Sequence, residues 1–524
     1  MDESSAFIRE RLKKLEDLSR DRVDPYPSTF PVTHLAGDLT RRYASADDAA
    51  LCAAEAVALA GRVLSLRGHG KASFAHIKDQ TGRIQIYVRQ DTVGESAYTL
   101  FRRIDVGDFL GVRGRLFRTK TGELTIHVDT LTLLAKALRP LPDKWHGLSD
   151  VEVRYRQRYV DLIANPSVAE VFRRRARIIA EIRRFFDERG FLEVETPMMQ
   201  PIPGGAAARP FVTHHNALDL SLYLRIAPEL HLKRCVVGGL ERVYEINRNF
   251  RNEGLSTQHN PEFTMLEFYQ AYADYRDLMA LTEELLPRIV RTVCGSDTVT
   301  YQGREISFAP PWPRLTLIEA LVKMGDLPPE CRAWLGRVGS DSQQGLRAVA
   351  DASGIAVKPA WGWGKLLVEL FEARVEGQLV QPTFITDFPA ELSPLAKART
   401  DDPRYAQRFE LYVAGLEVAN AYTELNDPRE QRRRLEAQAK ARAAGDEEAH
   451  HMDEDFVRAL EYGLPPTAGE GIGIDRLVML LTDSPSIRDV ILFPLLRPEG
   501  LGPETTDTDH GPRTTDHGPQ TEDR

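Results

Sequence analysis

Five short β-type runs with no long helix among them place the strongest constraint on how the first part of the chain folds. The runs are rich in β-branched and apolar residues, and glycine-containing turns separate them. Such a pattern predicts a small β-barrel of the OB type, in which closure leaves few strand edges exposed. The runs are VALAGRVLSLR, SFAHIKD, GRIQIYVR, FLGVRGRLFR and ELTIHVDTLTLL, all between residues 57 and 134.

Helix and strand patterns outside this segment predict further elements. Residues 5–20 carry apolar residues at helical spacing. Residues 171–191 do so more strongly, with Ile178, Ile182 and Phe185 on one stripe. The other expected elements are a strand carrying Pro197 in FLEVETPMM, a helix over 314–324, a less regular insert over 325–365, strands in QPTFITDFP and RFELYVAGLEVANAY, and a basic surface helix over 429–448.

Composition argues against several classes of protein. The chain has 524 residues and a formal net charge of −9, and it lacks any apolar stretch of the roughly 18 residues that a membrane span needs. Its charged N-terminal segment has no apolar core, so we expect no export. Four scattered cysteines without a CxxC pair fit a reducing cytosol and argue against structural zinc. Lys and Arg outnumber Asp and Glu between residues 62 and 127, which leaves the barrel basic despite the acidic total.

Two further segments place charged residues next to glycines and apolar residues, a mixture that is unusual in a hydrophobic core. Residues 250–263 read FRNEGLSTQHNPEF and residues 469–476 read GEGIGIDR. Arg251 and Glu253 are two residues apart, so on a strand they point to the same face. Arg476 follows glycines that allow the backbone to approach a ligand closely. Because arginine binds phosphate and aromatic side chains stack on bases, the two segments predict a nucleotide site.

Both segments resemble motifs 2 and 3 of the class II aminoacyl-tRNA synthetases, and the chain from about residue 55 to residue 498 is similar to the bacterial-type lysyl-tRNA synthetases. The resemblance implies an α+β multidomain protein, with an OB-fold barrel that binds the anticodon and a class II catalytic domain whose mostly antiparallel sheet is flanked by helices. The implied parts are a helical extension over 1–54, the barrel over 55–137, a linker over 138–150, the catalytic domain over 151–498, with motif 1 at about 171–200, motif 2 at about 241–270 and motif 3 at about 469–480, and a low-complexity tail over 499–524 that we expect to be disordered.

The resemblance assigns ATP to motifs 2 and 3. It implies that Arg251 binds the α-phosphate and the amino-acid carboxylate, and that Arg476 binds near the γ-phosphate and the adenine. These two arginines are therefore the expected catalytic residues. Gln258 departs from the family, which usually carries Arg or Lys at that position. The other matching positions, which hold the adenine and the phosphates, are Glu253, His259 and Phe263.

A pair of glutamates is expected to bind magnesium. If Ala414 and Gly415 form a two-residue turn in RFELYVAGLEVANAY, Tyr412 faces Glu417, and Glu410 lies diagonal to Glu417 on the same face. Diagonal neighbours lie roughly 7–8 Å apart, so long carboxylates can share Mg²⁺ whose other ligands are ATP phosphates. Pairs of glutamates are also common on surface hairpins that bind no metal, and the spacing alone does not distinguish the two cases. The resemblance identifies both as magnesium ligands.

Amino-acid recognition would depend on a third group of residues. Asn420, Tyr422 and Glu424 alternate along one strand, so they face the same way. A lysine substrate presents a remote ammonium, which needs a carboxylate and hydrogen-bond acceptors. The resemblance implies that Glu424 and Tyr269 receive this ammonium and that Glu229 receives the α-ammonium. The matching pocket positions are Gly205, Glu229, Tyr269, Asn420, Tyr422 and Glu424.

The same strand predicts a local distortion. Strict alternation from the hairpin turn puts Glu417 and Asn420 on opposite faces of the strand. Both can line one site only if an extra residue intervenes, and we therefore expect a β-bulge between them.

Phe74, Gln85 and Glu123 lie on the expected barrel strands. Such residues on strands are ordinarily surface or core residues, so the resemblance alone marks them as contacts to the anticodon of tRNA(Lys). Stacking of a base on an aromatic is worth roughly 1–3 kcal/mol. Gln85 and Glu123 would read the Watson–Crick edge of an unstacked uracil.

The resemblance as a whole implies a cytoplasmic homodimer, joined through motif 1, that uses ATP and Mg²⁺ to attach L-lysine to tRNA(Lys). Three alternatives remain. A paralogue that lysylates a protein generally lacks the barrel. A non-catalytic tRNA-binding or regulatory protein would be expected to lose Arg251, Glu417 or Arg476. An aspartyl or asparaginyl synthetase is opposed by the acid at Glu424, because an unpaired like charge is costly.

Overall fold

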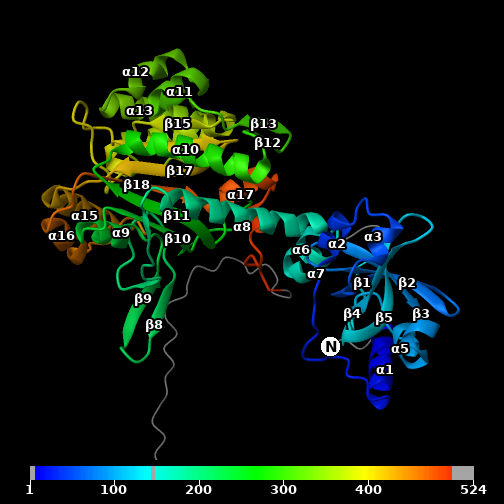
Figure 1. The fold of residues 1–524 in the computed structure, drawn as a ribbon. Helices are drawn as coiled ribbons and strands as arrows, with labels where there is room; N and C mark the ends of the chain where they lie inside the picture. Colours follow the sequence, from blue (N-terminus) through cyan, green and yellow to red (C-terminus); the bar gives the residue numbers. More distant parts are fainter. Residues whose placement is uncertain (1–5, 143–147, 499–524) are drawn as a thin grey trace, which may run out of the picture. The chain divides into compact units, whose positions relative to one another are not determined.

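The computed structural model describes residues 6–142 and 148–498, which form two compact units that divide between Ser149 and Asp150 (Figure 1). The tail expected over 499–524 lies outside the described residues, as does part of the linker expected over 138–150. Within the described ranges, no helix combines the length and the apolar character needed to cross a membrane.

The first unit contains the closed β-barrel that the sequence predicts. Its strands are β1 (Val57–His69), β2 (Ala72–Lys78), β3 (Arg83–Arg89), β4 (Phe109–Arg118) and β5 (Leu124–Ala135), with α4 (Gln90–Val93) and α5 (Glu95–Arg102) between β3 and β4. The strands pair in the order β1-β2-β3-β5-β4. Alternate side chains fill the interior, where Ile77, Ile86, Val112 and Val128 are fully buried.

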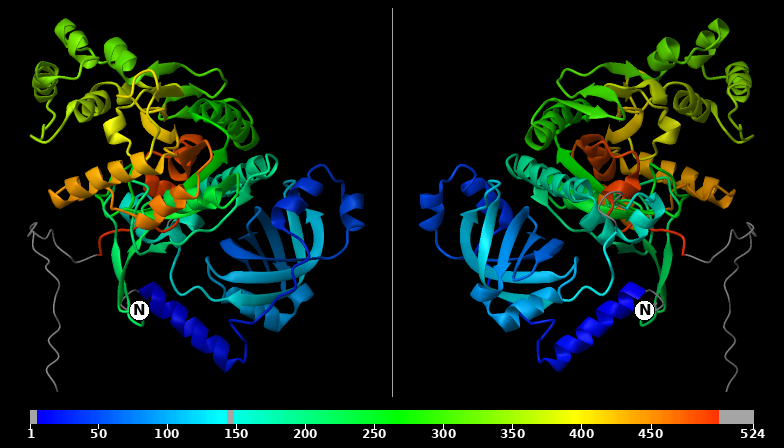
Figure 2. Two further views of the ribbon diagram at one scale, coloured as in Figure 1. Left: turned by 90° about the vertical axis from the view of Figure 1, so that its left-hand side faces the viewer. Right: turned by 90° about the vertical axis from the view of Figure 1, so that its right-hand side faces the viewer.

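Short helices precede the barrel in the chain. The first, α1 (Ala6–Arg20), confirms the amphipathic helix expected over 5–20, and it buries Ile8 and Leu18. Figure 2 shows this helix, in dark blue, at one end of the barrel. The helices that follow it are α2 (Ala36–Arg42) and α3 (Asp48–Cys52).

The second unit is built on an eight-stranded sheet that is mostly antiparallel, which confirms the expected fold class. Its strands are β6 (Leu192–Glu193), β10 (Arg242–Phe250), β11 (Glu262–Ala271), β14 (Arg314–Thr316), β15 (Thr383–Thr386), β16 (Arg408–Val413), β17 (Leu416–Thr423) and β18 (Thr467–Gly473). The order is β14-β15-β16-β17-β18-β11-β10-β6, and the two outermost pairs are parallel.

The two faces of this sheet differ because side chains alternate along each strand. Leu266 and Ala421 are fully buried on one face, against a layer of helices. Glu267, which follows Leu266, and Asn420, which precedes Ala421, point to the opposite face. The helices that cover the apolar face, seen in Figure 1, are α8 (Pro166–Asp187), α10 (Tyr275–Cys294) and α17 (Ile474–Thr482). The polar face is therefore the one available for a site.

Most expected helices are present, with shifted ends. The helix expected over 171–191 is α8, which starts earlier at Pro166, a residue suited to a first helical turn, and it buries Ile178, Ile182 and Phe185 as expected. The basic helix expected over 429–448 is α15 (Pro428–Ala443). The remaining helices of the second unit are α6 (Val151–Arg156) and α7 (Arg158–Ala164) at its start, α9 (Glu229–Val237), and α16 (Glu454–Glu461) and α18 (Ile487–Val490) in its C-terminal part.

The insert expected to be less regular over 325–365 is instead mostly helical and packs on a core of its own. The helix expected over 314–324 begins only at Leu317, because residues 314–316 extend the sheet as β14 and Thr316 caps the helix. The elements of this region are α11 (Leu317–Met324), η1 (Pro329–Cys331), α12 (Arg332–Leu335), α13 (Ser340–Ala352), α14 (Trp363–Arg374), η2 (Glu376–Gln378) and η3 (Ala390–Leu392).

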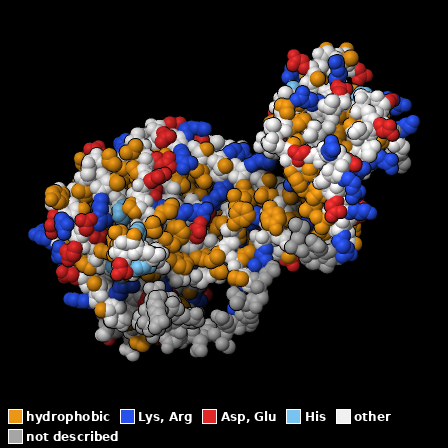
Figure 3. All heavy atoms as spheres, turned by 90° about the horizontal axis from the view of Figure 1, so that it is seen from below, with side chains coloured by type: hydrophobic (Ala, Val, Ile, Leu, Met, Phe, Trp, Pro, Cys, Tyr) orange, Lys and Arg blue, Asp and Glu red, His pale blue; other side chains and the backbone are white. Residues whose placement is uncertain are grey.

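The single strand expected in FLEVETPMM is wrong. Pro197 cannot donate a backbone hydrogen bond, and the segment is split into β6, at the sheet edge, and β7 (Met199–Gln200) in a separate small sheet. The partners of β7 and the second small sheet are β8 (Val212–His215), β9 (Leu220–Leu224), β12 (Thr298–Tyr301) and β13 (Arg304–Ser307). Leu192, Met198 and Met199 of this region are exposed, and Figure 3 shows hydrophobic side chains gathered on the face seen from below.

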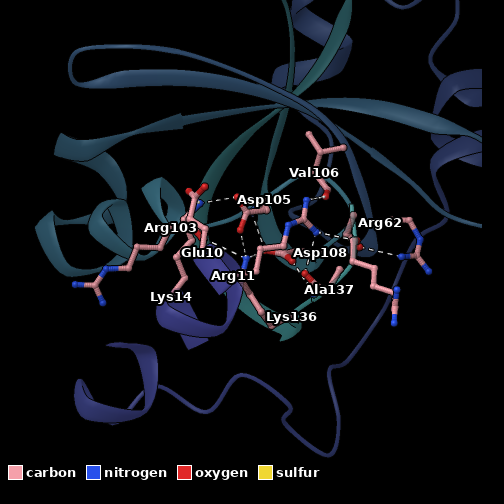
Figure 4. A network of polar contacts seen from close by, with 12 residues as sticks. Glu10, Arg11, Lys14, Arg62, Arg103, Asp105, Val106, Asp108, Lys136 and Ala137 are labelled. Carbon is pink, nitrogen blue, oxygen red and sulfur yellow. Dashed lines mark hydrogen bonds and ion pairs between the residues drawn. The ribbon is translucent and has the colours of Figure 1, made fainter. Parts of the chain in front are cut away.

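A partly buried ionic network fastens α1 to the barrel (Figure 4). Arg11 donates to three backbone carbonyls at 2.9–3.0 Å. Lys14 pairs with Asp105 at 2.7 Å. The ammonium of Lys136 is fully buried between Asp105 and Asp108, at 2.5 and 2.7 Å. Because Arg11 donates to backbone carbonyls and Lys14 pairs with a carboxylate of the barrel, the helix is held by directed contacts as well as by apolar packing.

Candidate active site

A cavity of about 600 Å³ opens on the polar face of the sheet in the second unit. Glycines make room for it: a Cβ on Gly469 would lie 2.2 Å from the Tyr269 ring, and one on Gly471 would lie 2.9 Å from Met265. All but one of the site residues predicted for this unit line the cavity, and the exception is Glu424. The lining residues among them are Gly205, Glu229, Arg251, Glu253, His259, Phe263, Tyr269, Glu410, Glu417, Asn420, Tyr422 and Arg476.

Arg251 presents an open guanidinium to this cavity. Its Cζ lies 5.0 Å from the centroid of the Phe263 ring, and no described residue makes a hydrogen bond to its side chain. Burial lowers the pKa of Arg251, and the nearby carboxylates of Glu253 and Glu417 oppose that shift. The strand argument for Arg251 and Glu253 is wrong, because β10 ends at Phe250 and both residues lie in the loop that follows. The loop nevertheless brings both to the cavity.

Arg476 lies in α17, directly after the glycine-rich strand β18. Its guanidinium donates to the backbone carbonyl of Glu417 at 2.6 Å and lies 3.3 Å from both the Glu417 carboxylate and the His259 ring. Burial and the positive charge of Arg476 lower the pKa of His259. The helix start is fixed by Asp475, which accepts from Arg175 of α8 at 2.5 Å and from the Thr264 backbone at 2.7 Å. The expected segments 250–263 and 469–476 therefore meet.

The hairpin of β16 and β17 has the predicted register. Ala414 and Gly415 both adopt positive φ, at 54° and 75°, as a two-residue hairpin turn requires. Tyr412 pairs with Glu417, and the register then shifts by one residue before Asn420 pairs with Glu410. The predicted bulge between Glu417 and Asn420 is confirmed, and it allows both side chains to reach one cavity.

Glu410 and Glu417 differ in how the protein holds them. Glu410 is buried and accepts from Arg408 at 2.5 Å, from Tyr412 at 2.6 Å and from Asn420 at 3.3 Å. Burial raises the pKa of Glu410 to about 7, with Glu417 adding to the shift and Arg408 opposing it. The Glu417 side chain is 37% exposed. Its carboxylate is thus the more accessible of the two.

The far end of the cavity is a buried polar pocket. Glu229 accepts from the Tyr422 hydroxyl and from Lys233, both at 2.5 Å and both on the same oxygen. Gly205 adopts a φ of +89°, and a Cβ there would lie 2.8 Å from the Glu229 Cβ, so this position requires glycine. Burial raises the pKa of Tyr269 well above its usual value, so its hydroxyl stays protonated.

Glu424 lies behind this pocket and not on its wall. It is 1% exposed, its ion-pair partner is Lys233, and its Oε1 lies against Gly469 beside the Tyr269 ring. Burial raises the pKa of Glu424 to about 8, while Lys233 opposes the shift. Of the three alternating residues expected to line the site together, Asn420 and Tyr422 do line the cavity, whereas Glu424 does not.

Sequence reasoning missed several residues of the pocket. Glu267 lines the cavity two positions before Tyr269, and burial together with Glu229 raises its pKa to about 8. Strand alternation from Tyr269 would have found it. His450 also lines the cavity, and burial lowers its pKa to about 4. No local pattern marks His450 or Lys233, because only the packing of distant segments brings them to the site.

The first unit brings its three predicted residues close together on the outer face of the barrel. Gln85 donates to Glu123 at 2.9 Å, and His76 lies 2.8 Å from the same carboxylate. The Phe74 ring stacks on Tyr87, with 4.5 Å between their centroids. A polar group and an aromatic surface thus lie side by side on β2 and β3, which is an arrangement suited to an unstacked base.

Comparison with known proteins gives a consistent result for both units. Residues 150–497 match the family of class II tRNA synthetases (D, K and N), and residues 57–134 match an OB-fold nucleic acid binding domain. The chain is 57% identical to a lysine–tRNA ligase of Moorella thermoacetica, over 93% of this chain and 97% of that protein. It is 54% identical to the enzyme of that name from Carboxydothermus hydrogenoformans, over 95% and 99%. The corresponding protein of Xanthomonas oryzae is 55% identical, over 95% and 97%.

Proposed function

Because this chain belongs to the class II tRNA synthetases of the D, K and N group, we propose that its cavity activates L-lysine with ATP and transfers it to tRNA(Lys). The observation that carries the proposal is the presence of opposite charges on the wall of one cavity. Arg251 offers a guanidinium without a protein partner among the described residues, whereas Glu229 and Glu267 offer buried carboxylates. Such a cavity fits a substrate that carries a carboxylate at one end and ammonium groups at the other.

The proposed reaction has two steps. A carboxylate oxygen of lysine attacks the α-phosphorus of ATP, and the bond to pyrophosphate breaks to leave lysyl-adenylate. A hydroxyl of the terminal adenosine of tRNA then attacks the carbonyl carbon, and AMP leaves. Arg251 and Arg476 supply positive charge along the phosphates, while Phe263 and His259 offer surfaces for the adenine. No protein nucleophile is required, because positioning and charge stabilisation account for catalysis of this kind.

Glu410 and Glu417 fit Mg²⁺ that is held jointly with ATP. Among the described residues, no group of three or more His, Cys, Asp or Glu side chains could hold a metal ion by itself. Mg²⁺ commonly takes one or two carboxylates and completes its shell with water and substrate phosphates. Glu417 is accessible for that role, and Glu410 lies close enough to raise the local negative charge. The metal would neutralise charge on the phosphates.

The pocket at the opposite end supports lysine over an acidic amino acid. Glu229, Glu267 and Glu424 would repel an aspartate side chain, and Lys233, the ammonium that pairs with two of them, leaves an excess of carboxylates at this end. For lysine, we propose that Glu229 with Gly205 receives the α-ammonium and that Tyr269 and Glu424 receive the side-chain ammonium. Asn420 and Tyr422 complete the wall between the two positions.

The barrel supplies the proposed contact to the anticodon. Phe74 would stack on a base, while Gln85 and Glu123 would read its edge. The proposed homodimer through motif 1 is supported by the exposed apolar residues Leu192 and Met198. We also propose that the protein acts in the cytoplasm, where its tRNA and ATP substrates are found.

Pyrophosphate–ATP exchange with each of the twenty amino acids, measured without tRNA, tests the proposed function. We expect exchange with lysine alone. Exchange with aspartate or asparagine would overturn the assignment of the pocket while keeping the class of reaction. If the folded protein shows no exchange with any amino acid, the chain is a non-catalytic relative, and the proposal fails.

A further inference from the structure

Lys233 is a buried lysine inside a pocket proposed to bind lysine. It lies on α9, one helical turn after Glu229, and is fully buried. Its ammonium lies 2.5 Å from Glu229 and also pairs with Glu424. The rings of Tyr422 and Phe456 lie 5.5 and 5.8 Å away and enclose it. The side chain therefore bridges the two carboxylates that are proposed to read the two ammonium groups of the substrate.

Three buried glutamates set the charge around Lys233. Glu229, Glu267 and Glu424 are each at least 94% buried and interact electrostatically with one another. Lys233 pairs with two of them, and His450 at the same cavity is neutral because burial lowers its pKa. Among the protein's own groups, burial raises the pKa of Glu267 and Glu424 to about 8, which favours their neutral forms at pH 7. When ammonium groups enter and all three glutamates are ionised, Lys233 leaves two negative charges for the ligand. A lysine substrate brings two ammonium groups, while its carboxylate is matched separately by Arg251.

Lys233 also fixes the position of Glu424. No hydroxyl or amide hydrogen bond from the described residues reaches either oxygen of Glu424, so the ion pair with Lys233 is what holds this carboxylate beside Tyr269. Burial lowers the pKa of Lys233, but Glu229 and Glu424 outweigh that effect and raise it overall, so the ammonium stays charged. An isolated buried carboxylate would otherwise take up a proton or move.

We propose that Lys233 is a positioning and specificity-determining residue: its ammonium holds Glu424 and Glu229 in place and cancels one of three buried carboxylates, so that the pocket matches a substrate with two ammonium groups. This inference rests on the proposed function. Lys233 does not contact the reacting atoms, and it acts through the two glutamates.

A double-mutant cycle separates this role from simple packing. Without Lys233, the unpaired glutamates would take up protons or move away. Lysine binding must then undo that change, so we expect Lys233→Met to raise the dissociation constant for lysine at least about tenfold. The KM for ATP should change less than about twofold. In a Glu424→Gln background, Lys233→Met should raise the dissociation constant for lysine less than about threefold, because the carboxylate that Lys233 holds is already gone.

The matched control is Arg234→Met on the same helix, whose side chain pairs with Asp453 and Asp455 away from the pocket. Binding is measured by calorimetry on the full chain, and thermal melting confirms that each variant is folded. The inference is overturned if Lys233→Met binds lysine as well as or better than the wild type. It is also overturned if Lys233→Met weakens lysine binding as much in the folded Glu424→Gln background as it does in the wild type. Failure of the wild type itself to bind lysine would overturn the proposed function and this inference together.

Discussion

The two ends of the cavity are built in opposite ways. At the end proposed for ATP, Arg251 and Glu253 lie on a loop, and the Arg251 side chain has no hydrogen-bonding partner among the described residues. At the end proposed for lysine, Glu229 and Glu424 are buried and already paired with Lys233. A nucleotide brings several charges of its own, so a guanidinium on a loop suffices at Arg251. A single ammonium must be read in a site where water is excluded, so its carboxylates are held in advance.

The largest effect is expected at the loop end. Arg251→Gln removes the open guanidinium and should reduce kcat/KM for lysine-dependent exchange by at least about a hundredfold, since donors aimed at developing charge are worth about 10²–10³ in rate. The control is Arg248→Gln on the same hairpin, which breaks an exposed pair with Glu262 and should leave exchange nearly unchanged. Equal loss in both variants would show that the hairpin fold matters and not the guanidinium.

The next effect is expected at the buried end. Glu229→Gln should raise the KM for lysine by roughly ten- to hundredfold, because hydrogen bonds to a charged group are worth about 1.5–3 kcal/mol. The KM for ATP should stay the same, because the change lies at the other end of the cavity. Steady-state exchange kinetics with each substrate varied in turn measure the two constants. A parallel rise in both would contradict the division of the cavity.

The buried end should also respond to pH. Burial raises the pKa of Glu267 to about 8, so this carboxyl is protonated below that pH and ionised above it. Only the ionised form attracts an ammonium, so the KM for lysine should fall severalfold as pH rises from 7 to 8.5, since one pKa unit corresponds to about 1.4 kcal/mol. The profile for Glu267→Gln should be flatter over the same range. An unchanged profile in that variant would assign the titration to another group.

The smallest effect is expected from Gln258, which lines the loop end of the cavity. Gln258→Arg adds a positive charge near the phosphates at a partly exposed position. It should lower the KM for ATP by about two- to fivefold, the scale of a screened surface interaction, and leave the KM for lysine unchanged. The effect should also weaken as salt is added. No change in the KM for ATP would show that Gln258 does not face the triphosphate.

Local patterns in the sequence determined the barrel strands, the hairpin turn at Ala414 and Gly415, and the bulge after Glu417. They succeed because strand alternation and turn chemistry depend on neighbouring residues alone. The same logic failed at Pro197, where a proline divides the expected strand, and at Arg251 and Glu253, because the strand ends at Phe250 before either residue.

The sequence by itself therefore determined the fold class of both units, and all but one of the site residues predicted for the second unit line the cavity. Only the tertiary structure decided that Glu424 lies behind the wall, that Lys233 bridges it to Glu229, and that His450 joins them. The physical reason is that buried charges are tolerated only where partners from distant segments meet them. Such meetings follow from the packing of α9 against the sheet, which no local period records.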